Sequence, residues 1–457
     1  MQLAESKRHF SLPFHVVKRL DTPKNIYWAI KIGGFLVALL LAGIICTIFR
    51  PGTFGLFYQQ MFLGCFDPSD TEVLIELLET VGILLLVAFA LAPAFKMKFW
   101  NIGGEGQILV GCLVTAGISK FMIGQNDTLT IIICLVAALA AGIIWAVIPA
   151  IFKAFFGTNE TLFTLMMNYI AMGLIAYFIN LWVPSGSQVF PLLRNASLPS
   201  LFGFDLIFNI LVVIVVVALM VIYLKKTKHG YELSVVGESV NTARYVGINV
   251  KKVIIRTMIL SGALCGLVGF LLVAGHHHTL STSLADGRGF TGVLIAWLGG
   301  FQPGQMIMYA FLVGIFQCGS RHAASTIGMN YTDFSAIITG VFFLVVIATE
   351  FFVNYKVKLK GKEEAAKVNK VADPLTVPSY SSEPLPTEDD EPSEVEKEEA
   401  PLPVKKPVKK AAKKASKPQK EAQKPAKKEK AAPKKAPAKN KPAAKKPAAK
   451  KSNKEAK

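Results

Sequence analysis

The chain has 457 residues, a formal net charge of +19 and a mean hydropathy of +0.44, and no ordinary soluble domain combines such a charge with such a hydropathy. The two properties belong to different parts of the chain. Residues 405–457 contain 22 lysines and three glutamates, which accounts for the whole net charge, whereas residues 1–404 contain 28 basic and 28 acidic residues. The earlier part contains uncharged apolar runs that are too long for a water-soluble core, so the sequence predicts an all-α polytopic membrane protein.

Ten apolar runs are candidates for membrane-spanning helices, since a span needs about 20 mostly apolar residues. They lie at 32–49, 77–95, 102–119, 129–152, 161–182, 206–224, 253–274, 289–301, 304–319 and 335–353. The eighth and ninth are short and are separated only by the Gly- and Pro-containing stretch 299–305, so we expect two half-helices or a re-entrant pair there. We therefore expect a transmembrane domain at 32–355, between an N-terminal segment, 1–31, and a tail, 356–457.

Ten spans place both ends of the chain on the same side of the membrane, and the distribution of Lys and Arg indicates which side that is. The N-terminal segment, the loop 225–252 and the tail from Lys356 are rich in basic residues. The long loop 183–205 has Arg194 as its only basic residue. Because cytoplasmic loops collect Lys and Arg, we expect both termini and the loop 225–252 to be cytoplasmic.

The tail changes composition beyond Lys360, where Lys, Ala, Pro and Glu predominate, first in an acidic stretch and then in a basic one. No aromatic residue follows Tyr380. Such a segment cannot bury a core, so we expect it to be disordered. Its positive charge suits either anionic lipid of the inner leaflet or non-specific contact with nucleic acid, and a solvated tail without a dedicated partner is the third interpretation.

The loop after the sixth span contains the signals of a short helix at 240–246. Ser239 is an N-cap residue type, and Gly247 is placed to end the helix in the left-handed conformation. A short, partly apolar helix between two spans on the inner face suits docking into a groove on a cytoplasmic partner. A plain structured linker is the alternative interpretation.

Two of the expected spans carry polar residues at helical spacing. In the third span, one helix face combines a polar side chain with small residues that permit close helix approach, namely Gly103, Gln107, Gly111 and Thr115. In the fifth span, Glu160, Thr164 and Asn168 form a stripe at i, i+4 and i+8. Polar groups inside a membrane are costly, so they mark either hydrogen-bonded helix contacts or a solute pathway. We favour a pathway for a neutral, hydroxyl-rich solute, with the candidate residues Asn101, Glu105, Gln107, Glu160, Thr164 and Asn168.

Three consecutive histidines, His276, His277 and His278, follow the seventh span. Consecutive residues of a helix point about 100° apart, and no cysteine or acidic residue stands at ligand spacing, so the three rings cannot converge on one metal ion. We therefore expect no metal site and a polar, external helix end. Asp286 and Arg288 are expected to be solvated loop charges.

Residues 230–249, with the sequence GYELSVVGESVNTARYVGIN, closely resemble the coupling segment of the permease subunits of ATP-binding cassette importers. The resemblance is to the branch that includes nucleoside, ribose-type sugar and branched-chain amino-acid systems. Three further motifs occur in the family's order, and they are NIGGEGQ at 101–107, the segment 159–171 and LGGFQPG at 298–304. Together the four motifs cover roughly residues 75–350.

The chain departs from the family pattern in three places. The family usually has Arg where this chain has Ser234, Asn-Pro where it has Ser239-Val240, and a small aliphatic residue where it has Trp297. Ser239 can still cap a helix, whereas the loss of a basic residue at 234 affects which partner fits.

The resemblance implies a permease subunit of a bacterial importer, multi-pass in the cell membrane, that moves a nucleoside inward. ATP and Mg²⁺ would be bound by cytoplasmic cassette subunits, since this chain contains no G-x-x-x-x-G-K-[ST] sequence and is expected to be no enzyme and to bind no cofactor. A second permease subunit and an extracellular solute-binding lipoprotein would complete the transporter. The residues implied to couple the chain to the cassette subunits are Gly237, Glu238, Ser239, Val240, Arg244, Tyr245 and Gly247.

Alternatives from the same and from other classes stay open. The same type of transporter can carry a simple sugar or a branched-chain amino acid. An ion-coupled secondary transporter normally needs buried acidic or histidine relays, for which Glu105 is the main candidate. A membrane scaffold would use the basic tail to tether nucleic acid or anionic lipid.

Overall fold

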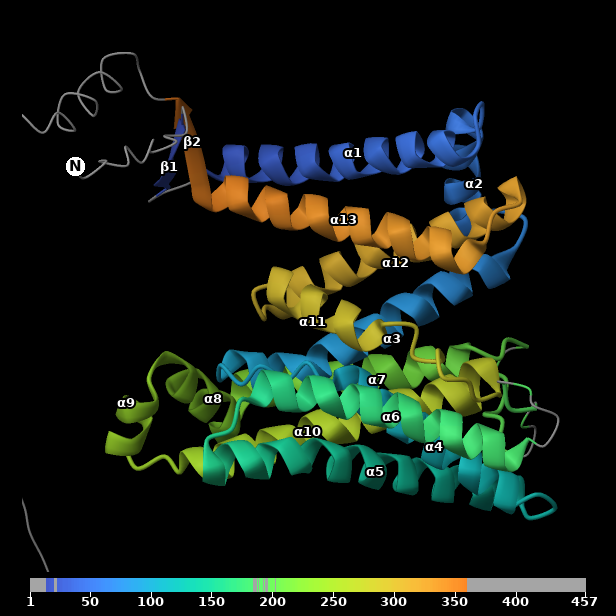
Figure 1. Ribbon diagram of the computed structural model, residues 1–457, viewed down its shortest axis with the longest axis vertical. Coiled ribbons are helices and arrows are strands. Elements are labelled where there is room, and N and C mark those ends of the chain that lie inside the picture. Colours follow the sequence, from blue (N-terminus) through green and yellow to red (C-terminus); the bar gives the residue numbers. More distant parts are fainter. Residues whose placement is uncertain are drawn as a thin grey trace, which may run out of the picture. The chain divides into compact units, whose positions relative to one another are not determined.

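The computed structural model describes residues 14–19, 23–183, 187, 189–191, 193, 196–201 and 203–359. The sequence expectations for the tail beyond residue 360 and for the first 13 residues lie outside the described residues. Within them the chain is almost entirely helical, in agreement with the predicted all-α class (Figure 1).

The elements follow one another as β1 (Phe14–Lys18), α1 (Lys24–Phe49), α2 (Phe54–Phe66), α3 (Thr71–Lys96), α4 (Gly104–Phe121), α5 (Asp127–Phe156), α6 (Glu160–Trp182), α7 (Ile207–Lys226), α8 (Lys228–Glu238), α9 (Val240–Tyr245), α10 (Val250–Leu271), the π-helix η1 (Leu272–His277), α11 (Arg288–Leu298), α12 (Pro303–Ile327), α13 (Tyr331–Asn354) and β2 (Tyr355–Leu359). Seven helices of the described chain are long and apolar enough to cross a membrane, and they are α1, α3, α5, α6, α7, α10 with η1, and α13.

Local side-chain chemistry sets where many of these helices begin. The side-chain oxygens of Asn126, Asn159 and Asn249 accept hydrogen bonds from the third backbone N–H that follows each of them, at the starts of α5, α6 and α10. Gly157 and Gly328 end α5 and α12 in the left-handed conformation. These five helix ends therefore follow from local side-chain and backbone chemistry.

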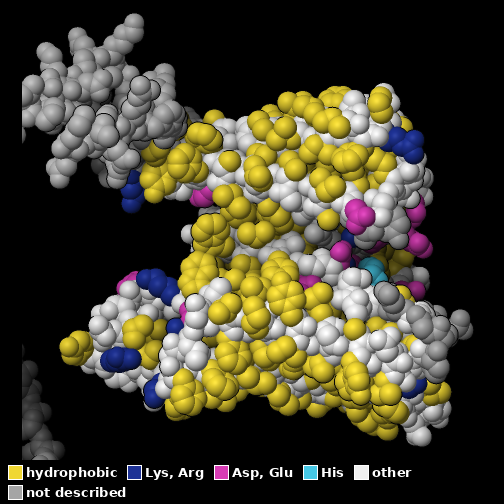
Figure 2. Space-filling model, viewed as in Figure 1, with side chains coloured by type: hydrophobic (Ala, Val, Ile, Leu, Met, Phe, Trp, Pro, Cys, Tyr) yellow, Lys and Arg dark blue, Asp and Glu magenta, His cyan; other side chains and the backbone are white. Residues whose placement is uncertain are grey.

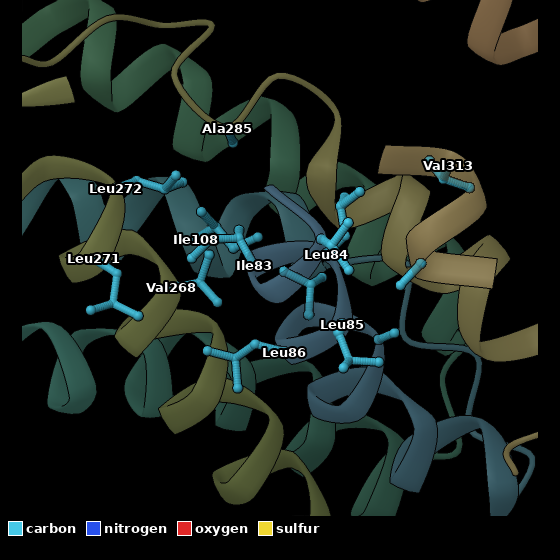
Figure 3. Packing of buried hydrophobic residues seen from close by; sticks show 14 of the residues in the cluster. Ile83, Leu84, Leu85, Leu86, Ile108, Val268, Leu271, Leu272, Ala285 and Val313 are labelled. Atoms are coloured by element: carbon cyan, nitrogen blue, oxygen red, sulfur yellow. The ribbon is translucent and has the colours of Figure 1, made fainter. Parts of the chain in front are cut away.

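Helix α3 lies at the centre of the described bundle, and every residue from Ile83 to Phe95 is buried. Figure 3 shows its leucines and Ile83 among apolar side chains of α4, α10 and α12. A helix that is apolar on all its faces needs neighbours on all of them. Contacts with α7, α10, α11 and α12 supply these neighbours.

Glycines let α4 and α5 approach α10 closely. A Cβ atom added at Gly142 of α5 would lie 2.2 Å from the carbonyl oxygen of Gly262, and one added at Gly111 of α4 would lie 2.8 Å from that of Gly266. Lipid tails are as apolar as Leu side chains, so membrane helices associate mainly through close van der Waals packing. The small-residue face predicted for the third span is thus a packing face.

Helix α11 is a half-helix. Its 11 residues rise about 16 Å, roughly half the thickness of the hydrocarbon core of a bilayer. The chain reverses after it through Gly300 and Phe301, which both have positive φ angles, and continues into α12 with 25 residues. The sequence analysis left half-helices and a re-entrant pair open for this region, and the structure combines one half-helix with one long helix.

Helix α2 and the β1–β2 pair were not expected from the sequence. The strands pair antiparallel with Val16 opposite Val357, so the start of α1 and the end of α13 lie together. Lys31 of α1 forms an ion pair with Glu350 of α13 and donates to the Tyr309 hydroxyl of α12. Ordered structure therefore extends on both sides of the expected domain limits at 32 and 355.

Helices α8 and α9 project at the same end of the described bundle as the β1–β2 pair (Figure 1). The end of α10 and the residues that precede α7 lie at the opposite end. This arrangement places the two ends of the described helical bundle on one side, together with the loop that is richest in basic residues.

Candidate functional site

A buried polar network surrounds the turn that leads into α4. Asn101 Oδ1 accepts hydrogen bonds from the Gly103 N–H at 3.1 Å and from Gln107 Nε2 at 3.4 Å. Asn101 Nδ2 donates to Ser261 Oγ of α10 at 3.1 Å, and Ser261 Oγ donates to Gln107 Oε1 at 3.5 Å. Asn101, Gln107 and Ser261 are all buried. The network joins α4 to α10 through neutral hydrogen bonds.

Two side chains of α6 satisfy backbone groups at the start of α4. Asn168 Oδ1 accepts from the Gly106 N–H at 2.9 Å, and Asn168 Nδ2 donates to the Ile102 carbonyl at 3.0 Å. Thr164 Oγ1 accepts from the Ile102 N–H at 3.3 Å. The first N–H groups of a helix have no partner within it, so these bonds act as caps supplied by another helix. Gly106 has no room for a side chain, because an added Cβ would lie 2.8 Å from Asn168 Oδ1.

Glu160 lies apart from that network. Its Oε2 is 2.6 Å from Lys153 Nζ, so the two charges join the end of α5 to the start of α6. A carboxylate in the first turn of α6 also interacts favourably with the helix dipole. The structure thus brings together four of the six predicted pathway residues, namely Asn101, Gln107, Thr164 and Asn168, and gives Glu160 and Glu105 separate partners.

The carboxylate of Glu105 holds the start of α11. Its Oε1 accepts from the Gly287 N–H at 3.0 Å and its Oε2 accepts from the Gly289 N–H at 2.7 Å. A carboxylate at a helix N-terminus satisfies free N–H groups and meets the positive end of the dipole. A Cβ atom at Gly289 would lie 2.3 Å from the backbone nitrogen of Glu105, so this contact requires glycine.

Arg288 is buried, with 5% of its surface exposed, and the expectation of a solvated loop charge was wrong for it. The segment before α11 folds back into the bundle, where Arg288 Nη1 donates to the Leu284 carbonyl at 3.2 Å. Its guanidinium interacts electrostatically with the buried carboxylates of Glu79 and Glu105. Asp286 stays half-exposed, 3.9 Å from the guanidinium of Arg321.

Sequence reasoning missed a second polar cluster around Glu79 of α3. His276 Nδ1 lies 3.2 Å from Glu79 Oε2, and Asn209 Nδ2 of α7 donates to Glu79 Oε1 at 3.4 Å. The prediction of an external helix end was therefore wrong for His276, whose imidazole is largely buried against this carboxylate. One acidic residue inside the long apolar run of the second span was the signal that pointed to the cluster.

The short helix predicted after the sixth span is present as α9. Ser239 Oγ accepts from the Thr242 N–H at 3.2 Å, which confirms the predicted N-cap. Gly247 has a φ of 80°, and its N–H donates to the Arg244 carbonyl at 3.0 Å, which confirms the predicted helix end.

Helices α8 and α9 are held rigidly against the bundle. Leu233, Val236 and Ala243 are buried in an apolar cluster with Met97 and Phe99 of the α3–α4 turn. A Cβ atom at Gly237 would lie 2.1 Å from the Lys96 carbonyl oxygen, so α8 makes direct backbone contact with the end of α3. Movement of this pair of helices would thus be transmitted to α3.

The His229 ring lies buried between α7, α8 and α10. It pairs with the Tyr223 hydroxyl, and its Nε2 lies 3.3 Å from Thr257 Oγ1. Burial lowers the pKa of His229, so the ring is neutral at neutral pH. Neutral hydrogen bonds therefore anchor the start of α8.

Apolar side chains are exposed on α9 and directly after it, beside the exposed polar residues Asn241 and Thr242. Tyr245 is 91% exposed and Val246 is 63% exposed, and Val240 is exposed on the same short helix. A groove of about 440 Å³ runs beside it, lined in part by Lys228, Lys252 and Arg256. Figure 2 shows basic side chains around apolar ones at this end. An exposed aromatic and aliphatic surface rimmed by charge is suited to docking a protein partner. Glu238 and Arg244 are also exposed, whereas Gly237 is buried.

The described chain is a multi-pass helical bundle with polar groups buried between its helices and a short, partly apolar helix exposed at one end, an architecture typical of a membrane permease. Residues 73–347 match the family described as "Branched-chain amino acid transport system / permease component", and the chain belongs to this family. The match runs from the start of α3 into α13 and so contains α8, α9 and the buried polar network. It confirms the resemblance drawn from the sequence motifs.

Named relatives come from bacteria and archaea. The chain is 28% identical over 338 residues to the "Guanosine ABC transporter permease protein NupP" of Bacillus subtilis, covering 71% of this chain and 96% of that protein. It is 28% identical to the "Nucleoside ABC transporter permease protein NupB" of Lactococcus lactis, covering 58% and 76%. It is 27% identical to the "Glucose ABC transporter permease protein TsgB13" of Haloferax volcanii, covering 63% and 78%.

Proposed function

We propose that the chain is the membrane-spanning subunit of an ATP-binding cassette importer that moves a nucleoside into the cell. The observation that carries the proposal is the exposed apolar face of α9 on a two-helix loop that contacts the end of α3 directly. Such a face suits a docking helix whose displacement is passed to the transmembrane bundle. The names of the NupP and NupB relatives supply the class of solute.

The proposed transporter contains four kinds of partner or ligand. Cytoplasmic cassette subunits bind ATP and Mg²⁺ and dock on the segment from Gly237 to Gly247. A second permease subunit, identical or related, forms the pathway together with this chain. An extracellular solute-binding lipoprotein delivers the nucleoside. The tail beyond residue 360 attracts anionic lipid or nucleic acid in proportion to its charge.

The six predicted pathway residues differ in how readily their side chains can contact the solute. Asn168 and Thr164 bond backbone groups of the α4 start, so they hold helices together. The side chain of Gln107 makes two long hydrogen bonds, at 3.4 and 3.5 Å, and both join it to other side chains. Hydrogen bonds of that length are weak, so Gln107 is the residue that can most readily exchange a protein partner for a solute hydroxyl or ring nitrogen.

Solute-dependent ATPase activity tests the proposal. The full chain, its cassette subunits, the second permease subunit and the lipoprotein would be co-expressed, purified and reconstituted into proteoliposomes. We expect nucleosides to stimulate ATP hydrolysis and to be taken up, and simple sugars and branched-chain amino acids to do neither. Stimulation by glucose or leucine with none by any nucleoside would instead establish the sugar or amino-acid alternative.

A further inference from the structure

A cavity of about 430 Å³ opens at the end of the described bundle opposite α8 and α9. It lies between the first turns of α3, the residues that lead into α7, and the end of η1. Figure 2 shows acidic and histidine side chains gathered around a hollow at this end. The lining side chains that carry chemistry are Glu72, Glu76, Phe204, Asp205, His276 and His278. A volume of this size falls within the range of small-molecule sites, about 300–1,000 Å³.

Buried polar atoms adjoin this cavity. Asn209 is fully buried, and its Oδ1 accepts no hydrogen bond from any described residue. The oxygen faces Gly275, a lining residue, so closely that a Cβ atom there would lie 2.1 Å from it. Glu79 Oε2 is also buried, and it lies 3.2 Å from Nδ1 of His276, another lining residue. These buried polar groups lie directly behind Gly275 and His276, so polar atoms back this part of the cavity wall.

The backbone along the cavity has two uncommon conformations. Residues Leu272–His277 form a π-helix, and His278 follows with a φ of 52°. Single π-turns occur frequently at functional sites, and a non-glycine residue in the left-handed region is held there by its surroundings. The two features place both His276 and His278 on the cavity wall.

The cavity is acidic. Glu72 and Asp205 have no ion-pair partner in the described part of the chain, whereas Glu76 is 3.5 Å from the guanidinium of Arg321. Burial lowers the pKa of His278, so its ring is neutral at neutral pH and does not offset the carboxylates. A site walled by carboxylates attracts cations and uncharged hydrogen-bond donors and repels anions.

We propose that this cavity is the outer loading site for an uncharged nucleoside and that its carboxylates reject the phosphorylated form. The inference rests on the proposed function and adds a site and a selection rule to it. Phe204 and the imidazoles present flat faces for a base, and Glu72 and Asp205 accept hydrogen bonds from ribose hydroxyls. The same two carboxylates repel the dianion of a nucleoside monophosphate.

Thiol protection on the purified transporter tests the site without the solute-binding lipoprotein. The six natural cysteines lie within the described residues, and all six are buried. Ile75→Cys places a thiol on the cavity wall and leaves both carboxylates in place. We expect guanosine to slow maleimide labelling of this thiol at least about threefold and guanosine monophosphate to leave it unchanged at the same concentration. Ile123→Cys, at an exposed position outside the cavity, is the matched control that neither compound protects.

Charge and stacking variants test the selection rule. In the Ile75→Cys background, Glu72→Gln with Asp205→Asn should lower the guanosine monophosphate concentration needed for half-protection roughly tenfold, because two repulsive charges are removed. Asp127→Asn, an exposed carboxylate outside the cavity lining, should change nothing. Phe204→Ala should raise the guanosine concentration for half-protection about tenfold, since stacking on the base is lost.

The outcomes separate this inference from the proposed function. Equal protection by guanosine and its monophosphate with both carboxylates present overturns the selection rule. Absence of guanosine protection in a transporter that takes up guanosine overturns the site and leaves the function standing. Absence of nucleoside uptake by the wild-type transporter refutes the proposed function whatever the labelling shows.

Discussion

The contact between Glu105 and Gly289 shows how single residues determine helix placement in this bundle. Glu105 lies in the first turn of α4, and its carboxylate accepts hydrogen bonds from two backbone N–H groups at the start of α11. The close approach depends on Gly289, because a Cβ atom there would meet the Glu105 backbone nitrogen. A backbone atom cannot move aside as the end of a flexible side chain can.

Gly289→Ala should therefore destabilise the protein by about 1–3 kcal/mol through overpacking. The thermal midpoint of the purified chain in detergent measures the effect. Gly304→Ala is the matched control, because no described atom lies within 4 Å of its added Cβ. Equal midpoints for the two variants would mean that α11 is free to shift away from α4.

Gln107 and Asn168 allow the pathway and the packing interpretations to be separated. Gln107→Leu should lower apparent affinity about fivefold for the natural nucleoside and less for an analogue that lacks the bonded group, because one neutral hydrogen bond is worth on the order of 1 kcal/mol. Asn168→Leu leaves the Gly106 N–H and the Ile102 carbonyl unpaired and should reduce the amount of folded protein. Uptake ratios of solute to analogue, with protein amounts from size-exclusion chromatography, measure both effects. An unchanged ratio in Gln107→Leu would assign that residue to packing as well.

At the scale of secondary structure, α8 and α9 are short helices that project at one end of the described bundle and carry exposed apolar side chains. One face packs on the α3–α4 turn and the other exposes Tyr245 and Val246. Ser239 caps the N-terminus of the six-residue helix α9, and Gly247 ends it at the C-terminus. An isolated helix of this length is unstable in water, so its rigidity comes from these caps and from the buried side of α8.

Val240→Asp combined with Tyr245→Asp should abolish ATP-driven uptake and leave the folded chain intact, since both side chains are exposed. A charge introduced at the proposed docking face would lose its hydration when the face is buried against a cassette subunit, and this cost weakens docking. Uptake, ATPase activity and co-purification of cassette subunits would be measured together. Ile123→Asp, a charge on an apolar residue that is 70% exposed at the other end, is the control and should transport normally. Normal uptake in the double variant would remove the coupling assignment.

At the scale of the whole chain, the β1–β2 pair and the Lys31–Glu350 ion pair join the first and last described helices. A two-stranded sheet alone is marginally stable, but α1 and α13 pack side by side and hold its strands together. This connection lies outside the part of the chain that matches the family.

Truncation after Lys362 should leave uptake unchanged, whereas truncation after Asn354 should lower the thermal midpoint by about 2–4 °C, because it deletes β2. Truncation after Asn354 also removes the charges of Lys356 and Lys358. Val357→Pro in the full chain disrupts the strand pairing and keeps both charges, so it tests the contribution of the strand alone. Transport at a small fraction of the full-length rate after truncation at Lys362 would make the tail part of the mechanism.

Properties that depend on neighbours in the sequence were predictable. Apolar runs predicted the all-α class, and Ser239 and Gly247 predicted the limits of α9, because span length and helix capping are local effects. The predicted count of ten spans is not confirmed, since seven helices of the described chain are long and apolar enough to cross a membrane. The four sequence motifs identified the family that the match over residues 73–347 confirms. The polar stripe of α6 was visible in the sequence, although its partners were not.

Properties that depend on segments far apart in the sequence were decided by the tertiary structure. Arg288 and His276 look like loop and surface residues in the sequence, yet the return of the chain into the bundle buries both next to carboxylates of α3 and α4. The Glu79–His276–Asn209 cluster needs α3, α7 and η1 together, and the Asn168 cap needs α6 against α4. Burial and hydrogen-bond partners belong to the packed arrangement of helices, since a single helix specifies which face is polar and not what that face meets.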